Sequence, residues 1–190
     1  MKRFVLVLIA TLMTVNSFAQ TIKGDKTTDE GRKIMMESKK YYGTDRDDKM
    51  ALHYISHGDA EVFLLDLDFD ESGKTIEAGY KMLLKQSSNN IMELVCVQGD
   101  HNTRYNMTPF VWALGIIHTE KGQYLLTREE VESIIHDPVV KIRVEYQWGY
   151  FDVNTSDLVR KSKFSYMVEK MYNRINDALE NQKTGLYDGF

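Results

Sequence analysis

Three histidines carry the clearest potential for chemistry, because imidazole serves both as a metal ligand and as a general base. His53 and His57 are four residues apart, and His101 follows Gly99 and Asp100. On a helix, the first two side chains would share a face and could bind one zinc ion. In the strand predicted here they are about 13 Å apart, a gap that two Zn–N bonds of about 2.1 Å cannot bridge. We therefore predict no metal site.

Other ligands could join these histidines only through folding. Asp59, in a predicted turn after His57, and the predicted turn Gly99–His101 would have to meet in space. Solvated turn residues explain the same sequence more simply. A metal-dependent enzyme that uses His53, His57 and His101 is the least favoured of our three hypotheses.

A group of acidic residues has a spacing similar to an EF-hand calcium loop. Asp66, Asp68 and Asp70 alternate, and Glu77 follows at the twelfth position. The pattern fails at the sixth position, where Glu71 replaces the glycine that the sharp turn requires. We predict instead a strand whose acidic side faces water.

The remaining candidates for catalysis are also better explained by folding. Cys96 is the single cysteine and lies in an apolar segment, so it is predicted to be a buried core thiol. Glu129, Glu130 and Asp157 fit helix capping and helix-dipole roles. The sequence contains no G-x-S-x-G, no H-E-x-x-H and no glycine-rich phosphate loop after a strand. We predict no cofactor, and the catalytic residues, if any, are unknown.

A succession of strands is predicted to position these residues. The strongest alternates over 140–148, with five side chains pointing inward and the charged or polar residues between them facing water. A turn is predicted at His57–Asp59, a second at Ser87–Asn90 and a third at Lys121–Gly122. The other predicted strands are 50–57, 61–69, 81–86, 91–97, 110–118 and 123–126, and the inward residues of the strongest are Val140, Ile142, Val144, Tyr146 and Trp148.

Three helices are predicted. The first spans 29–42, and the second is a short helix near 128–135 that begins at the Thr127–Glu130 capping box. The third is a long amphipathic helix that begins at the Thr155–Asp157 cap and ends near Gln182. The fold class is α+β: a curved, mainly antiparallel sheet of about five to seven strands, with the N-terminal helix, the short helix and the C-terminal helix packed on it.

Composition restricts the class of protein. The chain has 190 residues, of which 43% are hydrophobic and 27% charged, with a formal net charge of −4. These values are typical of a globular domain, and a mildly acidic chain without a basic stripe is not expected to bind nucleic acid.

The N-terminal segment predicts export. Lys2 and Arg3 precede the apolar run Phe4–Val15, and Ser17–Ala19 offers a small-x-small cleavage site. This pattern is a secretory signal peptide over 1–19, too short to span a membrane. The expected organisation is a flexible N-terminus over 20–28, one α+β domain over 29–182 and a tail over 183–190. The mature protein should be soluble, periplasmic or secreted, without a lipid anchor or a membrane span.

Two segments carry a family resemblance. Tyr124–Val131 and Val139–Glu145, followed by a polar break and a terminal amphipathic helix, resemble a family of uncharacterised exported bacterial proteins. The resemblance is best over 124–146. It implies the same fold and no catalytic residues.

Two non-catalytic hypotheses are preferred. The first is an exported non-enzymatic domain that serves binding or envelope maintenance, with an unknown protein as its partner. The second is a periplasmic carrier of lipid or another small apolar ligand, since a helix that leads into successive strands is similar to the start of periplasmic lipoprotein carriers.

Overall fold

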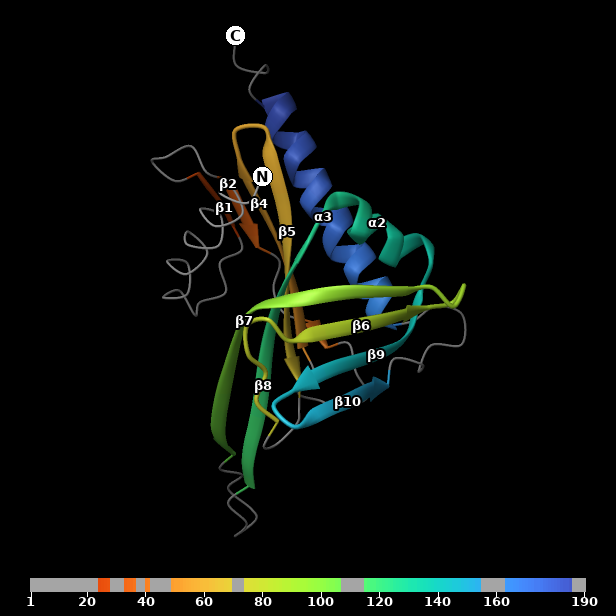
Figure 1. Cartoon of the computed structure of the whole chain (residues 1–190). Coiled ribbons are helices and arrows are strands. Elements are labelled where there is room, and N and C mark those ends of the chain that lie inside the picture. The colour runs from red at the N-terminus through yellow and green to blue at the C-terminus, as the bar shows by residue number, and fades with distance from the viewer. Residues whose placement is uncertain are drawn as a thin grey trace.

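A computed structural model describes residues 24–27, 33–36, 40–41, 49–69, 74–106, 115–154 and 163–185. Every strand pair among them is antiparallel, and two helices pack on the strands (Figure 1). The strands are β1 (Gly24–Thr27), β2 (Lys33–Met36), β3 (Lys40–Tyr41), β4 (Lys49–His57), β5 (Ala60–Phe69), β6 (Lys81–Gln86), β7 (Ile91–Asn106), β8 (Gly115–Leu126), β9 (Val139–Tyr146) and β10 (Gly149–Asn154). The helices are α2 (Arg128–His136) and α3 (Lys163–Gly185).

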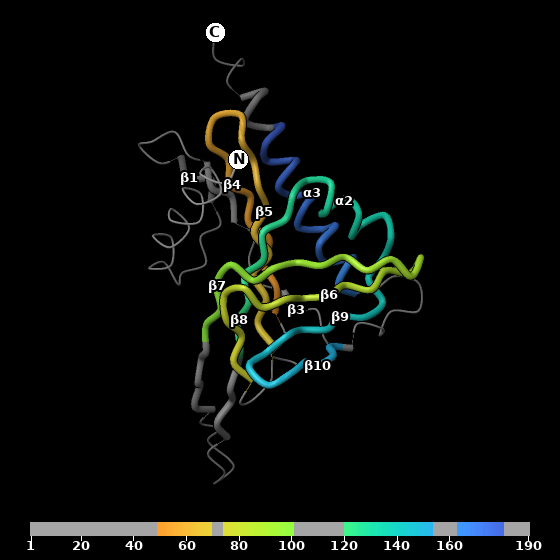
Figure 2. Tube along the Cα trace, viewed as in Figure 1, coloured from red at the N-terminus to blue at the C-terminus, as the bar shows by residue number. Residues whose placement is uncertain are grey.

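The long strand β7 joins two parts of the sheet. Its residues Ile91–Val95 pair with β6, and its residues from Cys96 onward pair with β8, with a register shift between Cys96 and Gln98. We call sheet A the part that contains β1 to β5, β8 and the second portion of β7. Sheet B contains the first portion of β7 with β6, β9 and β10. The strands of sheet B run across those of sheet A at a steep angle (Figures 1 and 2).

A close main-chain contact marks this junction. A Cβ placed on Gly99 would lie 1.8 Å from the carbonyl oxygen of Ile76, so the segment that leads into β6 passes directly over β7. Only a residue without a side chain permits this approach. The junction between the sheets therefore depends on glycine at position 99.

The short helix α2 begins as the sequence predicts. The Thr127 hydroxyl accepts a hydrogen bond from the Glu130 amide at 3.2 Å, and the Glu130 carboxylate accepts one from the Thr127 amide at 2.7 Å. This reciprocal capping box satisfies two amides that would otherwise lack partners in the first helical turn. Val131 and Ile134 of this helix are buried.

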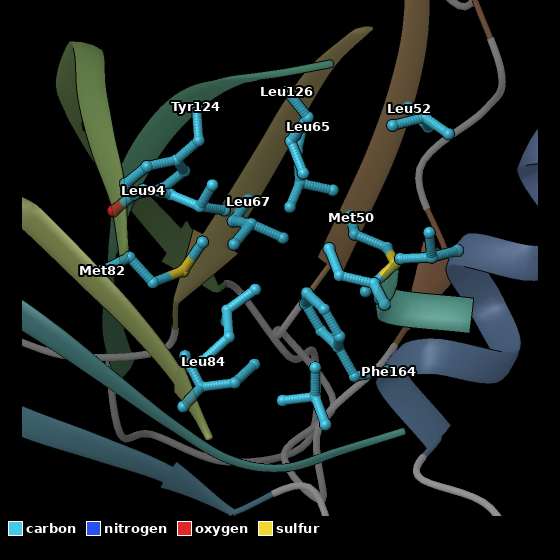
Figure 3. Packing of buried hydrophobic residues seen from close by; sticks show 14 of the residues in the cluster. Met50, Leu52, Leu65, Leu67, Met82, Leu84, Leu94, Tyr124, Leu126 and Phe164 are labelled. Atoms are coloured by element: carbon cyan, nitrogen blue, oxygen red, sulfur yellow. The ribbon is translucent and has the colours of Figure 1, made fainter. Parts of the chain in front are cut away.

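The hydrophobic core lies between the strands and the two helices. We call the side of each sheet that contributes to this core its inner face, and the opposite side its outer face. Figure 3 shows Phe164 of α3 among side chains of β4, β5 and β6, and burial of such side chains contributes roughly 1.5–3 kcal/mol each. The apolar face predicted for the C-terminal helix is confirmed. Its buried residues are Phe164, Val168, Met171, Tyr172 and Ile175.

The prediction of five to seven strands matches the seven strands β4 to β10, but the N-terminal prediction differs from the structure. Where residues 29–42 are described, they form β2 and β3 instead of a helix, and the remainder lies outside the described residues. Main-chain pairing with β4, in which Ile34 lies opposite Ile55, replaces the helical hydrogen bonds that the local pattern favoured. Part of the predicted flexible N-terminus is strand β1.

The third predicted turn is also wrong. Lys121 and Gly122 lie inside the continuous strand β8, where they pair with Asp100 and Gly99 of β7. Local turn signals at these two residues are overridden by pairing on both sides, since β8 lies between β5 and β7. Residues 107–114, which include most of the apolar segment predicted as strand 110–118, lie outside the described part of the chain.

The strongest predicted strand is confirmed at its centre and wrong at its ends. Ile142 and Val144 are buried, but Val140 is exposed and Val139 is buried in its place. A register shift between β6 and β9 at Lys85 and Gln86 changes the phase of the alternation there. At the other end, Trp148 lies in the turn between β9 and β10 and is 77% exposed.

The proposed signal peptide over 1–19 lies outside the described residues, as does the predicted cap at 155–157. Helix α3 is described from Lys163 and continues to Gly185, beyond the predicted end at Gln182. Neither α2 nor α3 is long and apolar enough to cross a membrane.

Candidate functional site

The three histidines lie far apart in the sheet. His53 is in the row of Leu64, whereas His101 is in the row of Phe69, five residues further along β5. That separation is about 17 Å along the strands, and three strand spacings of about 4.8 Å add to it. His57 pairs with Ala60 at the opposite end of β5. The fold does not bring these residues together, and the described residues contain no group of three His, Cys, Asp or Glu side chains that could hold a metal ion.

The two turns predicted to carry further ligands, at Asp59 and at Gly99–His101, do not meet either. Asp59 is in the turn that joins β4 to β5, whereas Asp100 pairs with Lys121 in the middle of β8. Asp100 is therefore a strand residue and not part of a turn. The hypothesis of a metal-dependent enzyme requires a convergence that the strand register does not provide.

The outer face of sheet A buries charged groups. Asp66 and Asp68 are only 9% and 4% exposed, so the prediction that this side of the strand faces water is wrong. The Nε2 atom of His53 lies 3.9 Å from a carboxylate oxygen of Asp66. Asp68 lies opposite Lys49 in β4 and Lys121 in β8. Cross-strand pairs of opposite charge reduce the cost of burying such groups.

The resemblance to a calcium loop also ends here. Asp66 and Asp68 belong to the regular strand β5, paired on both sides, and do not form a loop that could wrap around an ion. Glu77 is exposed in the segment before β6, and Asp70 lies outside the described residues.

Cys96 is confirmed as a core residue. It lies opposite Tyr124 on the inner face of sheet A, and both side chains are buried. Burial raises the pKa of the Cys96 thiol and also the pKa of the Tyr124 phenol. A thiol with a raised pKa is a poor nucleophile, so neither group is suited to nucleophilic catalysis.

A polar cluster around Arg128, which the sequence did not predict, joins both helices to β5. The guanidinium donates two hydrogen bonds to the carboxylate of Glu61, at 2.6 and 2.9 Å, and one to the hydroxyl of Tyr172 at 2.8 Å. The Tyr172 hydroxyl in turn donates to Glu132 at 2.7 Å. Tyr54 completes the cluster by donating to Glu61 at 3.1 Å.

The electrostatics of this cluster favour a fixed ion pair. The hydrogen bonds from Arg128 hold the pKa of Glu61 below its ordinary value, and the same contacts raise the pKa of Arg128. Burial raises the pKa of Tyr54. Glu61 and Arg128 therefore keep their opposite charges at neutral pH, and the cluster fastens α2 and α3 to the tip of the β4–β5 hairpin. Sixty-seven residues separate Glu61 from Arg128, and no local pattern links them.

The outer face of sheet B has the opposite character, because it exposes apolar side chains. Ile91 is 65% exposed, and Val95 on the same strand is also exposed. Tyr150 lies on the far strand of the sheet, next to the turn that contains Trp148. Among the described residues, five of the six exposed large hydrophobic side chains belong to this sheet: Ile91, Val95, Val140, Trp148 and Tyr150.

Charged side chains occupy the space between these apolar groups. Lys81 contacts Glu93 at 2.9 Å, and Asp152 accepts hydrogen bonds from Arg143 at 2.7 and 3.1 Å. Lys141 also contacts Asp152 at 2.7 Å. These hydrogen bonds, the one from Arg143 first, lower the pKa of Asp152 to about 2.

The register of the four strands arranges this face in rows. Lys85 lies opposite Ile91 on one side and Lys141 on the other, and Leu83 lies opposite Glu93 and Arg143. Alternation along each strand predicts which residues share a side, but the rows also require the order β7-β6-β9-β10, which is not the order in the sequence. We call this set of outward residues the sheet B face: Ile91, Glu93, Val95, Lys81, Leu83, Lys85, Lys141, Arg143, Glu145, Tyr150 and Asp152.

The sheet B face offers apolar contact and paired charges, which suit binding better than a chemical step. Comparisons of the chain with protein-family models, with curated proteins and with solved structures gave no match.

Proposed function

We propose that this chain is an exported, non-enzymatic binding domain of the cell envelope, and that the sheet B face is its contact surface. One observation carries the proposal: exposed large apolar residues gather on one sheet, while the other sheet buries the outer carboxylates Asp66 and Asp68. Contiguous exposed apolar groups on a protein surface mark sites of interaction.

The chemistry of the sheet B face supports this role. Tyr150 in the sheet B face and Trp148 in the turn beside it are residue types that dominate the free energy of binding at protein interfaces. The charges between the apolar groups are already paired within the face, as in Arg143 with Asp152. A partner that covers the sheet B face therefore does not have to provide a counter-ion for every charge.

The N-terminal segment supports export to the cell envelope. Residues 1–19 have the three-part pattern of a secretory leader, with Lys2 and Arg3 before an apolar run. Fractionation of cells that express the full chain tests this part. Export predicts a shortened protein outside the cytoplasm, whereas an uncleaved cytoplasmic protein would contradict it.

Site-specific photo-crosslinking in the encoding organism tests the contact surface. A benzophenone amino acid replaces Tyr150 on the sheet B face, or Tyr166, an exposed tyrosine on α3, as the matched control. We expect an adduct from position 150 and none from position 166. We also expect Ile91→Ser to reduce the adduct from position 150 without changing the amount of folded protein.

The crosslinking results can contradict a specific role for the sheet B face in three ways. Equal adducts from both positions, or an adduct from position 150 that Ile91→Ser leaves unchanged, would contradict a specific role for the sheet B face. No adduct from either position would also count against the proposal.

The carrier of an apolar ligand remains an untested alternative. The inner faces of the sheets are lined by the protein's own aliphatic and aromatic side chains (Figure 3), and no feature of the described core favours a ligand over packing. Native mass spectrometry of freshly purified protein discriminates the two, since a carrier should retain an apolar molecule of defined mass.

A further inference from the structure

Strand β10 forms one edge of the sheet, and its hairpin determines which main-chain groups face outward. The two-residue turn Gln147–Trp148 makes Tyr146 and Gly149 the closing pair. Hydrogen-bonded and non-hydrogen-bonded pairs alternate from there. Phe151 therefore directs its amide and carbonyl toward β9, whereas Tyr150 and Asp152 direct theirs away from the sheet.

The same alternation is consistent across the rest of sheet B. The Gln86 amide donates to the Asn90 carbonyl and the Cys96 amide donates to the Tyr80 carbonyl, as expected if even-numbered residues of β6 face β7. The amide of Lys81, an odd-numbered residue of β6, points toward β9 and donates to the Glu145 carboxylate. The assignment of outward groups on β10, which rests on its turn and its register with β9, thus agrees with the bonds between β6, β7 and β9.

No described strand pairs with the outward side of β10. Neither Tyr150 nor Asp152 makes a main-chain hydrogen bond on that side to any described residue. Natural edge strands are usually blocked by lysine, by proline or by a β-bulge. Strand β10 reads Gly-Tyr-Phe-Asp-Val-Asn and pairs with β9 without a register shift, so it has none of these devices.

The charge on this edge does not prevent pairing either. The carboxylate of Asp152 is its only ionised side chain, and it is neutralised by Arg143 and Lys141 of the adjacent strand. The other edge of sheet B, Ile91–Val95, differs, because β7 leaves this sheet at the register shift after Cys96. A strand added there would meet the crossing strands of sheet A.

We infer that two copies of this chain pair through β10, antiparallel and about a two-fold axis at Phe151. In this register Tyr150 lies opposite Asp152 of the second copy, and each pair exchanges two main-chain hydrogen bonds, four in all. The alternative axis at Asp152 would place two aspartates directly opposite each other, which like charge disfavours. The pairing is isologous, so it closes at two copies.

The pairing would extend the sheet B face. Two four-stranded sheets become one eight-stranded sheet, in the order β7-β6-β9-β10 followed by the same strands reversed. Tyr150 and Trp148 of each copy move from the margin of one surface to the centre of the combined one. The inference does not depend on the proposed function, because an edge can pair whether or not the sheet B face binds another molecule.

Sedimentation velocity of the purified mature chain over a range of concentrations provides the test. We expect a monomer–dimer equilibrium, since an interface of one strand pair is small. Asp152→Pro removes an amide that faces outward and leaves the hydrogen bonds to β9 intact. Asp152→Asn removes the same charge and keeps the amide. We expect the dissociation constant to rise about ten-fold or more for Asp152→Pro and to change little for Asp152→Asn.

Hydrogen exchange of the unmodified chain gives a second measurement that does not depend on any variant folding. The amides of Tyr150 and Asp152 should become protected as concentration rises, whereas the amide of Ile91 on the other edge should not. A monomer at every concentration would overturn the inference, as would a dimer that Asp152→Pro leaves unchanged. Open oligomers that grow with concentration would also overturn it, because they indicate contact between unlike edges. An adduct between two copies at position 150 would report this pairing, whereas an adduct with a different molecule tests the sheet B face.

Discussion

The outer faces of the two sheets differ in which side chains are buried and which are exposed. On sheet A, Asp66 is buried beside His53 and Asp68 is buried opposite Lys49, whereas on sheet B the apolar side chains of Ile91 and Val95 are exposed. Both faces alternate regularly with an apolar inner face. Alternation thus identifies the two sides of a strand but does not determine which side meets water.

The contrast indicates different roles for the two faces. A buried charge is costly unless it is paired, so the outer face of sheet A depends on cross-strand partners for stability. An exposed apolar group contributes little to folding and is available for contact with another molecule. We therefore expect the outer face of sheet A to contribute to stability, and we propose recognition as the role of the sheet B face.

The largest effect is expected from the carboxylate of Asp68. We expect Asp68→Asn to lower the free energy of unfolding by about 3 kcal/mol, because it removes a buried carboxylate that lies opposite Lys49 and Lys121. The matched change Asp152→Asn, on the exposed face, should cost less than about 1 kcal/mol. Urea unfolding of both variants measures the difference. Equal losses would remove the distinction between the faces.

A second, smaller effect is expected at the junction of the sheets. Gly99→Ala should lower stability by about 2 kcal/mol, because the new methyl group meets a main-chain oxygen and forces the backbone to move. Gly122 lies directly opposite in β8, where a new Cβ would meet only the side chain of Tyr124. Gly122→Ala should therefore lower stability by less than Gly99→Ala does. Thermal unfolding of both variants measures this difference. The reverse order would show that the crossing of Ile76 over β7 does not constrain the junction.

The smallest effect is expected at Glu61, whose side chain is neither fully buried nor fully exposed. Its pKa is depressed below 4.5 in the folded protein by the hydrogen bonds from Arg128, so the stability it contributes is present above that pH. It is lost as the pH falls through the depressed pKa. Glu61→Gln should cost about 1 kcal/mol at pH 7, and the difference from the unmodified chain should disappear in acid.

Unfolding curves at several pH values measure this difference. Glu93→Gln, which removes an exposed partner of Lys81, serves as the control and should have a smaller effect at pH 7. A loss for Glu61→Gln that is the same at pH 3 and pH 7 would contradict the ion-pair explanation.

Local signals were sufficient for several elements of the fold. The capping box at Thr127 and Glu130 requires only four consecutive residues, and it predicted the start of α2 correctly. The spacing of Phe164, Val168 and Met171 predicted the buried side of α3, because helical periodicity is also a local property of the sequence. Predictions failed where pairing with distant strands decides the outcome, as for β2 against β4 and for Lys121 inside β8.

The candidate site was less accessible to sequence reasoning than the fold. The rows of the sheet B face form because β6 lies between β7 and β9, so that Leu83 meets both Glu93 and Arg143. No sequence pattern specifies that order of strands. The register shift at Lys85 and Gln86 then exposes Val140, which regular alternation had assigned to the core.

Strand β7 belongs to both sheets, and this has a consequence for cooperativity. Since its first residues complete sheet B and its later ones complete sheet A, neither sheet can melt while the other keeps all its strands. Dividing the chain into two fragments along the boundary between the sheets would cut a strand that each fragment needs. The two sheets therefore form a single unfolding unit.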